Sequence, residues 1–260
     1  KVIGLNVNKI FLSATHTHTA PVLENDSTFS FRYKIPEKGV LQVDEYVRFF
    51  VKQVSDAIIK AWNSRKPGSI TWGLSHASVA YNRRAVYADG TSVMYGNTNN
   101  PDFLNLEGTE DHDVNTLFFW DKSGKLIAMT INVPCPSQVV EHRSAVNADY
   151  WHPVREKLKQ RFGTDVTILG WGGASGDQSP RPLYRKKAEA RMIKLRNLSE
   201  TEEIARRICI AVEDAYETVK NDKHKEIILI HKTEILSLPV RKVTEEEYHF
   251  SISERDKYSA

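Results

Sequence analysis

Two histidines stand one residue apart in the stretch FLSATHTHTAP, at His16 and His18. A neutral imidazole is a good ligand for zinc and other divalent metals. If this stretch is extended, residues two apart share a face, so both rings would point into one cavity. The pair therefore predicts two metal ligands, or one metal ligand beside one group that contacts a substrate. The alternative is two polar histidines in a loop.

The stretch GGASGDQSP, Gly172 to Pro180, holds a second set of reactive groups. Its glycines let the backbone turn tightly, and its N–H groups can face an anion or an oxyanion. Ser175 and Ser179 are candidate nucleophiles, and Asp177 is a candidate acid that orients one of them. The alternative is a turn without catalytic chemistry.

A third polar segment, Asn82-Arg83-Arg84, ends the run SITWGLSHASVAYN. By itself it is typical of a solvated loop. It gains interest because all three polar segments follow predicted strands, and α/β folds place their sites where strands end.

The elements that must position these groups alternate between helix and strand. Four helices are predicted. VDEYVRFFVKQVSDAIIKAW has apolar residues at steps of three and four, and DYWHPVREKLKQRFG runs from an Asp149 N-cap to a Gly163 C-cap. The third is opened by the Ser199–Glu202 capping box, and the fourth is TEEEYHFSISERDKYSA. Strands are predicted in SITWGLSHASVAYN, in DVTILGWG, in a hairpin turning at Ser123-Gly124, and in a pair around EIILIHKTEILSLPV. This alternation predicts an α/β, mixed α+β fold of mixed sheets layered with helices.

Composition limits the partners. The 260 residues are 40% hydrophobic and 27% charged with a formal net charge of +3, so no strong field draws nucleic acid. The two cysteines have no metal-ligand spacing, and no apolar run is long enough to cross a membrane. We expect one catalytic domain over residues 1–260, incomplete at both ends, because the chain starts at Lys1 and stops inside a helical pattern.

The three polar segments resemble, in the same chain order, the neutral (alkaline, non-lysosomal) ceramidases. SATHTHTAP is similar to the family's THTHSGP, YNRR to its NRS or NRR, and GGASGDQSP to its GDxSP loop, over about Leu12 to Pro180. Family members are zinc-dependent amidases that cleave the amide of N-acyl sphingosine and have a large mixed α/β catalytic domain. The resemblance also implies a secreted or periplasmic bacterial protein.

Carried over residue by residue, the resemblance implies a zinc ligand at His16, a substrate-side polar group at His18, a positioning cation at Arg83 and the catalytic hydroxyl at Ser179. The zinc would polarise the carbonyl or activate the attacking oxygen. Ser179 is expected to be the functional hydroxyl in place of Ser175, because it has the serine position of GDxSP and Pro180 holds its backbone extended.

The chain departs from the family at a second metal ligand. The family has a histidine after the strand that here reads AMTINVPCPSQ, where this chain has Cys135-Pro136-Ser137, and proline cannot bind zinc. His142 and His152 are the nearest replacements, and His152 is preferred because the start of a helix fixes its direction. We expect the two-histidine motif to form a polar pocket floor with weak metal affinity or none.

Three functions fit these observations. The first is a metal-assisted hydrolase acting on a small lipid-like or polar amide, or on a related acyl substrate. The second is an amidohydrolase-type metal hydrolase, which requires a (β/α)8 barrel that the predicted hairpins oppose. The third is a metal-free, ceramidase-like binding protein for a lipid or a glycan, which Pro136 favours.

Overall fold

The computed structural model describes residues 4–23 and 36–257. They fall into two compact units. One joins the residues before Leu12 to those from Leu229 on, and holds the short 3-10 helix η1 (Val7–Lys9) and helix α6 (Glu245–Lys257). The other, Leu12–Ile228, contains every further helix and strand of the described residues, together with all of the candidate functional residues.

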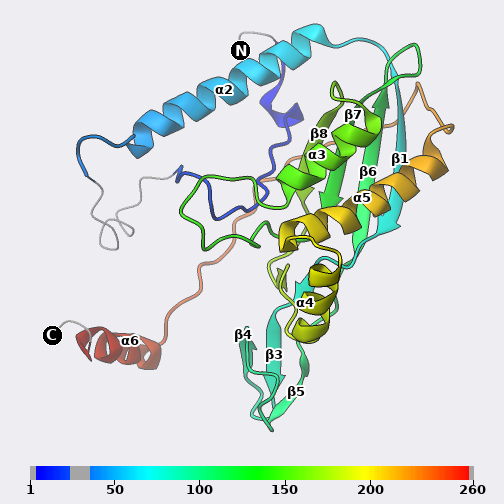
Figure 1. Ribbon diagram of the computed structural model, residues 1–260. Helices are drawn as coiled ribbons and strands as arrows, with labels where there is room; N and C mark the ends of the chain where they lie inside the picture. The colour runs from blue at the N-terminus through cyan, green and yellow to red at the C-terminus, as the bar shows by residue number, and fades with distance from the viewer. Residues whose placement is uncertain (1–3, 24–35, 258–260) are drawn as a thin grey trace. The chain divides into compact units, whose positions relative to one another are not determined.

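A four-stranded sheet forms the centre of the larger unit, in the order β1-β6-β7-β8 (Figure 1). Its strands are β1 (Ser69–His76), β6 (Asp113–Trp120), β7 (Leu126–Val133) and β8 (Thr167–Gly172). β6 pairs antiparallel with both β1 and β7, whereas β7 and β8 run parallel. The predicted hairpin is confirmed as β6–β7, with Gly124 at φ 83° in its turn.

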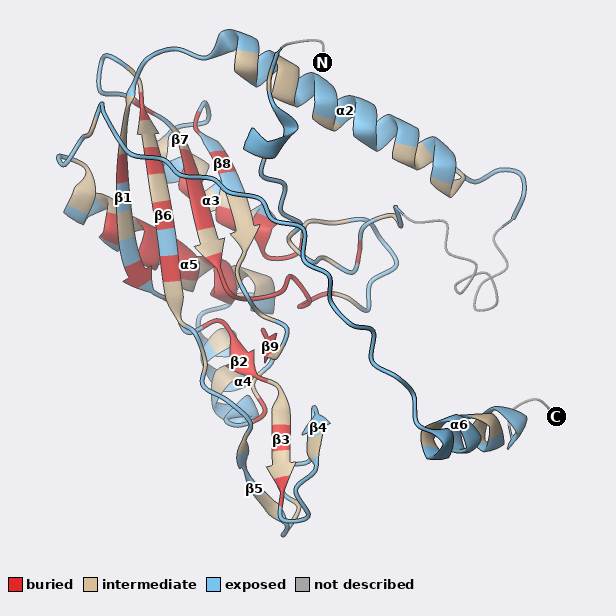
Figure 2. Ribbon diagram, turned by 180° about the vertical axis from the view of Figure 1, so that it is seen from behind, coloured by how far each residue is buried: buried red, intermediate tan, exposed pale blue. Residues whose placement is uncertain are grey.

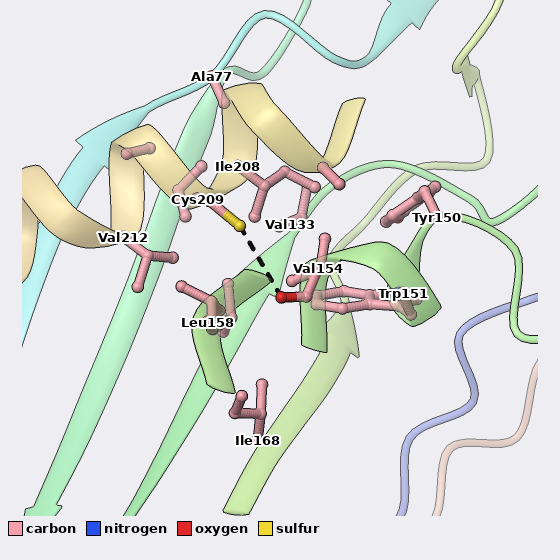
Figure 3. Packing of buried hydrophobic residues seen from close by; sticks show 14 of the residues in the cluster. Ala77, Val133, Tyr150, Trp151, Val154, Leu158, Ile168, Ile208, Cys209 and Val212 are labelled. Atoms are coloured by element: carbon pink, nitrogen blue, oxygen red, sulfur yellow. Dashed lines mark hydrogen bonds between the residues drawn. The ribbon is translucent and has the colours of Figure 1, made fainter. Parts of the chain in front are cut away.

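Helices α3 (Trp151–Phe162) and α5 (Glu200–Val219) cover one face of this sheet (Figure 1). α3 buries Trp151, Val154 and Leu158, and α5 buries Ile208 and Val212 among others. Figure 3 shows these side chains meeting those of the sheet, with the thiol of Cys209 3.8 Å from the Val154 carbonyl oxygen. Burial raises the pKa of that thiol to about 12. Each such apolar side chain contributes about 1.5–3 kcal/mol, so this layer accounts for much of the stability.

Two smaller sheets lie beyond the main one. β3 (Arg84–Tyr87) is flanked by β4 (Ser92–Met94) and β5 (Phe103–Leu106), and β2 (Tyr81–Asn82) pairs with β9 (Gln178–Ser179). Helix α4 (Lys186–Leu195) follows β9. Figure 2 shows that buried residues extend from the main sheet and its helices into β2 and the loop after β7.

The mixed α+β class is therefore confirmed, and the described residues contain an open sheet with antiparallel pairs in place of the parallel barrel that an amidohydrolase needs. The predicted first helix is α2 (Val43–Ser64), although none of its residues is buried. The capping box at Ser199 and the Gly163 C-cap are confirmed. The predicted strand pair around EIILIHKTEILSLPV is wrong, because residues 225–243 contain no strand.

The predicted N-cap of α3 is also wrong by one residue, since Tyr150 has that position. Asp149 is buried at φ 51°, and its carboxylate accepts the backbone N–H groups of Val140 and Tyr150 at 2.9 and 2.7 Å. The Asp149 side chain, which the sequence pattern assigned to the helix start, thus makes a tertiary contact with the loop after β7.

The packing of β8 against α3 gives a stability prediction. A Cβ at Gly170 would lie 2.5 Å from ring atoms of Trp151, which is buried, so Gly170→Ala should destabilise the protein by about 1–3 kcal/mol. Gly176→Ala is the matched control, because a Cβ there meets nothing within 4 Å. Urea unfolding of both variants tests this, and equal midpoints would contradict it.

Candidate active site

The short β2–β9 ladder places two of the polar segments side by side. Tyr81 lies opposite Ser179 and Asn82 opposite Gln178. The backbone N–H of Arg83 donates to the carbonyl oxygen of Asp177 at 2.9 Å, and Asn82 Nδ2 donates to the Asp177 carboxylate at 3.1 Å. The hydrogen bonds of Asp177 therefore join the YNRR segment to the glycine-rich loop and, within the described residues, do not reach a serine.

Ser179 is fully buried, with an exposed fraction of 0%. Its Oγ accepts the backbone N–H of Arg181 at 3.1 Å and the hydroxyl of Tyr95 at 3.3 Å. Ser175 is only partly buried, and its Oγ donates to the carbonyl oxygen of Gly173 at 3.2 Å. The two serines therefore differ in their hydrogen bonds, because the Ser179 oxygen accepts from two donors and the Ser175 hydroxyl donates within its own loop.

His16 and His18 lie together, with Nε2 atoms 3.4 Å apart and ring centroids 5.0 Å apart. The expected extended backbone is wrong, since His16 has φ 61°. The segment is instead held by the loop after β7, through Ser137 N–H to the Thr15 carbonyl at 3.1 Å. Both histidines are exposed, so they do not form an enclosed pocket floor among the described residues.

The carboxylate of Glu141 connects His18 to the glycine-rich loop, Gly172 to Pro180, which is called the serine loop below. Its Oε2 lies 3.2 Å from His18 Nδ1, and its Oε1 accepts from Arg181 Nη1 at 2.8 Å. The Arg181 backbone N–H is the group that donates to Ser179 Oγ. His18 Nε2 also lies 2.8 Å from Gln138 Nε2. This pattern fits the tautomer that carries its proton on Nδ1 and accepts at Nε2 from the amide.

Arg83 lies between the serine loop and the histidines. Its Nη2 donates to the Gly176 carbonyl at 2.7 Å, and its guanidinium carbon lies 5.8 Å from the centre of the Tyr95 ring. The pKa of His16 is lowered, first by partial withdrawal from solvent and then by the charges of His18 and Arg83. His16 is therefore held toward its neutral form, which is the form that binds a metal or accepts a proton.

The structure thus connects four of the predicted residues, His16, His18, Arg83 and Ser179, by contacts and electrostatic coupling within one unit. His152 lies exposed in the first turn of α3, and His142 is also exposed. Sequence reasoning missed Glu141, Arg181 and Tyr95. Glu141 and Arg181 each adjoin a segment that was already singled out, whereas no pattern marked Tyr95.

The donor set is incomplete for zinc. Two nitrogens bound to a tetrahedral zinc stand about 3.3 Å apart, which is close to the separation of the two Nε2 atoms. The described residues, however, hold no group of three or more His, Cys, Asp or Glu placed to bind a metal. Cys135, beside Pro136, is no substitute, because burial raises the pKa of its thiol far above the ordinary value. The residues present therefore do not make a complete zinc site.

A cavity of about 500 Å³ opens beside the serine loop. Its wall includes Tyr95, Pro180 and Arg181, apolar side chains such as Val139, Leu183 and Ile193, and charged side chains: Lys186, Glu189, Glu200, Glu203 and Arg207. A second cavity, of about 540 Å³, shares Tyr95, Leu183 and Lys186 with the first and is lined by the start of α4. Tyr95 is thus the residue of the Ser179 contact shell that borders both cavities.

Comparison with protein-family models and with curated protein sequences gives no match. Among solved structures, the chain is similar to a ceramidase complexed with C2, at 15% identity and a TM-score of 0.56, over 81% of this chain and 31% of that one. It also aligns with neutral ceramidase from Pseudomonas aeruginosa, at 14% identity and a TM-score of 0.48, over 69% of this chain and 27% of that one. The chain spans about a third of the length of these proteins or less, and the first likeness shows a ceramidase-like fold.

No helix among the described residues is long and apolar enough to cross a membrane.

The electrostatic coupling of Arg83 to His16 is directly measurable. Arg83→Gln removes a positive charge that disfavours the imidazolium, so the pKa of His16 should rise toward its ordinary value. Arg84→Gln is the matched control, because the charge of Arg84 faces Glu107. NMR titration of the His16 ring protons in both variants tests this, and an unchanged His16 pKa in Arg83→Gln would contradict the geometry.

Proposed function

We propose that this chain carries the active site of a hydrolase that cleaves an amide or a related acyl bond, with Ser179 as the functional hydroxyl. The observation that carries the proposal is the connected set of contacts that joins Ser179 Oγ through Arg181 and Glu141 to His18 and His16. The two histidines lie more than 120 residues before Glu141, and Glu141 lies 38 residues before Ser179. The ceramidase-like fold is consistent with this chemistry.

The surroundings of Ser179 Oγ support a reactive role for this oxygen. Both groups that hydrogen-bond to it are donors, an N–H and an O–H, and donors bind an oxygen more strongly as it gains negative charge. Asp177 keeps the loop in place through Asn82, and Arg83 holds the loop's Gly176 carbonyl. In this role Arg83 and Asp177 are positioning residues.

His16 and His18 are the imidazoles that meet in the structure, and the described residues add no third ligand that would complete a zinc site. In the structure His18 Nε2 faces the Gln138 amide, so a metal would compete with Gln138 for the same lone pair. Two imidazoles also hold zinc weakly. We therefore propose weak metal affinity.

The cavity next to the serine loop is the candidate site for the substrate. Its volume of about 500 Å³ is within the range of small-molecule sites. Its wall combines apolar side chains, which suit an acyl group, with charged ones such as Lys186 and Glu189, which suit a polar end. We propose a small lipid-like or polar amide as the substrate, in a secreted or periplasmic setting.

The second candidate function is a metal-free binding protein for a lipid or a glycan. The observation that favours it is the pair of imidazoles without a third ligand among the described residues, next to Pro136. In that case the cavity and the exposed histidines would recognise a ligand without cleaving it.

Substitution of the two serines separates these functions. Ser179→Ala should lower turnover of fluorogenic acyl amides by about a thousandfold or more while leaving the circular dichroism spectrum unchanged, because a nucleophile is worth several orders of magnitude. Ser175→Ala is the matched control in the same loop and should retain most activity. Loss of activity in Ser175→Ala alone would make the assignment wrong, and a complete absence of turnover with tight ligand binding would favour the binding protein.

The metal content provides an independent measurement. Zinc should fall well below one equivalent after dialysis against a mild chelator, because only two imidazoles meet. Elemental analysis of the dialysed protein tests this, with His16→Ala as the reference for a disrupted site. Stoichiometric zinc after dialysis would contradict the expectation, and its loss in His152→Ala would identify the replacement ligand.

A further inference from the structure

We infer that Tyr95 is a further catalytic residue of the proposed site, whose hydroxyl donates to Ser179 Oγ and stabilises negative charge on that oxygen. This inference rests on the proposed role of Ser179. Its first support is the contact itself, 3.3 Å between the two oxygens, with Tyr95 as the donor. The Arg181 N–H donates to the same oxygen at 3.1 Å, so two donors converge on one hydroxyl.

The backbone of Tyr95 gives the second support. Tyr95 has φ 55°, a left-handed conformation that is strained for a bulky residue and persists only where the surroundings hold it. Its N–H donates to the carbonyl oxygen of Arg83 at 2.7 Å. The strained conformation directs the phenol at Ser179, which lies 84 residues further along the chain.

The position of the ring gives the third support. Ser179 has no exposed surface and borders neither cavity, whereas Tyr95 is 42% exposed and borders both. The guanidinium carbon of Arg83 lies 5.8 Å from the ring centre, within the range of a cation–π contact that fixes the ring. A molecule in either cavity therefore meets Tyr95 next to the serine oxygen.

These features define a role without proton transfer from Tyr95. Negative charge on Ser179 Oγ is met by the Tyr95 O–H and the Arg181 N–H, and Tyr95 keeps its proton throughout. Phenylalanine at position 95 would fill the same space and remove only the donor. This makes Tyr95→Phe a test of the hydrogen bond and not of the packing.

The sharpest test replaces the oxygen by a titratable group. In Ser179→Cys the introduced thiol should ionise at a lower pH when Tyr95 is present, because the phenol donates to the thiolate. Adding Tyr95→Phe should raise the pKa of that thiol by about one unit. Thiolate absorbance near 240 nm measures it without a substrate, when followed from pH 6 to the highest pH at which the fold is retained, since position 179 is buried. The difference from the same protein with Ser179 cancels the native Cys135 and Cys209, whose thiol pKa values burial raises, that of Cys209 to about 12.

Tyr184→Phe in the same Ser179→Cys background is the matched control, because Tyr184 lines the second cavity, whereas the groups that donate to Ser179 Oγ are those of Tyr95 and Arg181. A thiol pKa that rises in Tyr95→Phe and not in Tyr184→Phe supports the inference. Equal values in all three proteins overturn it.

Should Ser179→Cys fail to fold, Tyr95→Phe alone provides the measurement. It should lower kcat by about tenfold to a hundredfold with KM nearly unchanged, since the lost interaction strengthens only as charge develops. An unchanged kcat overturns the inference. The two proposals fail separately: full turnover in Ser179→Ala removes the proposed nucleophile, whereas the thiol pKa still reports whether Tyr95 donates to position 179.

Discussion

The parallel pairing of β7 with β8 is the constraint on which the candidate site depends. Because the two strands run in the same direction, with Val133 opposite Gly172, the loops that follow them start at the same end of the sheet. The first of these loops carries Gln138 and Glu141, and the second carries Ser179. An antiparallel arrangement would have sent the two loops to opposite ends of the sheet, more than 15 Å apart for strands of this length.

Close backbone approach at this end requires the glycines of the second loop. The Gly173 N–H donates to the Val133 carbonyl at 3.0 Å, and a Cβ on Gly173 would lie 3.0 Å from Pro134 Cα. A Cβ on Gly172 would lie 3.3 Å from the Ala14 carbonyl, in the segment that leads to the histidines. Small residues thus let three chain segments meet where larger ones would hold them apart.

Charged side chains add further contacts where these backbone segments meet. Glu141 stands between the His18 imidazole and the Arg181 guanidinium, and its side chain is 28% exposed, so its ion pair with Arg181 contributes about 1 kcal/mol at most. These contacts orient Arg181 more than they stabilise the fold. The Arg181 guanidinium donates to Glu141 and to the Val139 carbonyl, and its backbone N–H donates to Ser179. Left-handed backbone at His16, Tyr95 and Asp149 shows that the site region also holds strained conformations, which packing elsewhere must offset.

Local patterns in the sequence determined the elements whose hydrogen bonds are short in range. The periodicity of α2, the capping box of α5, the Gly163 C-cap and the β6–β7 turn could all be predicted, because each depends on residues a few positions apart. The three polar segments also stood out by composition. The tertiary structure alone decided that Asp149 serves the loop after β7, that residues 225–243 form no strand, and that Glu141 meets Arg181 and Tyr95 meets Ser179. Glu141 and Arg181 are 40 residues apart in the sequence, and Tyr95 and Ser179 are 84 apart. A contact between residues so far apart leaves no periodic pattern in the sequence, because its geometry exists only after the strands have paired.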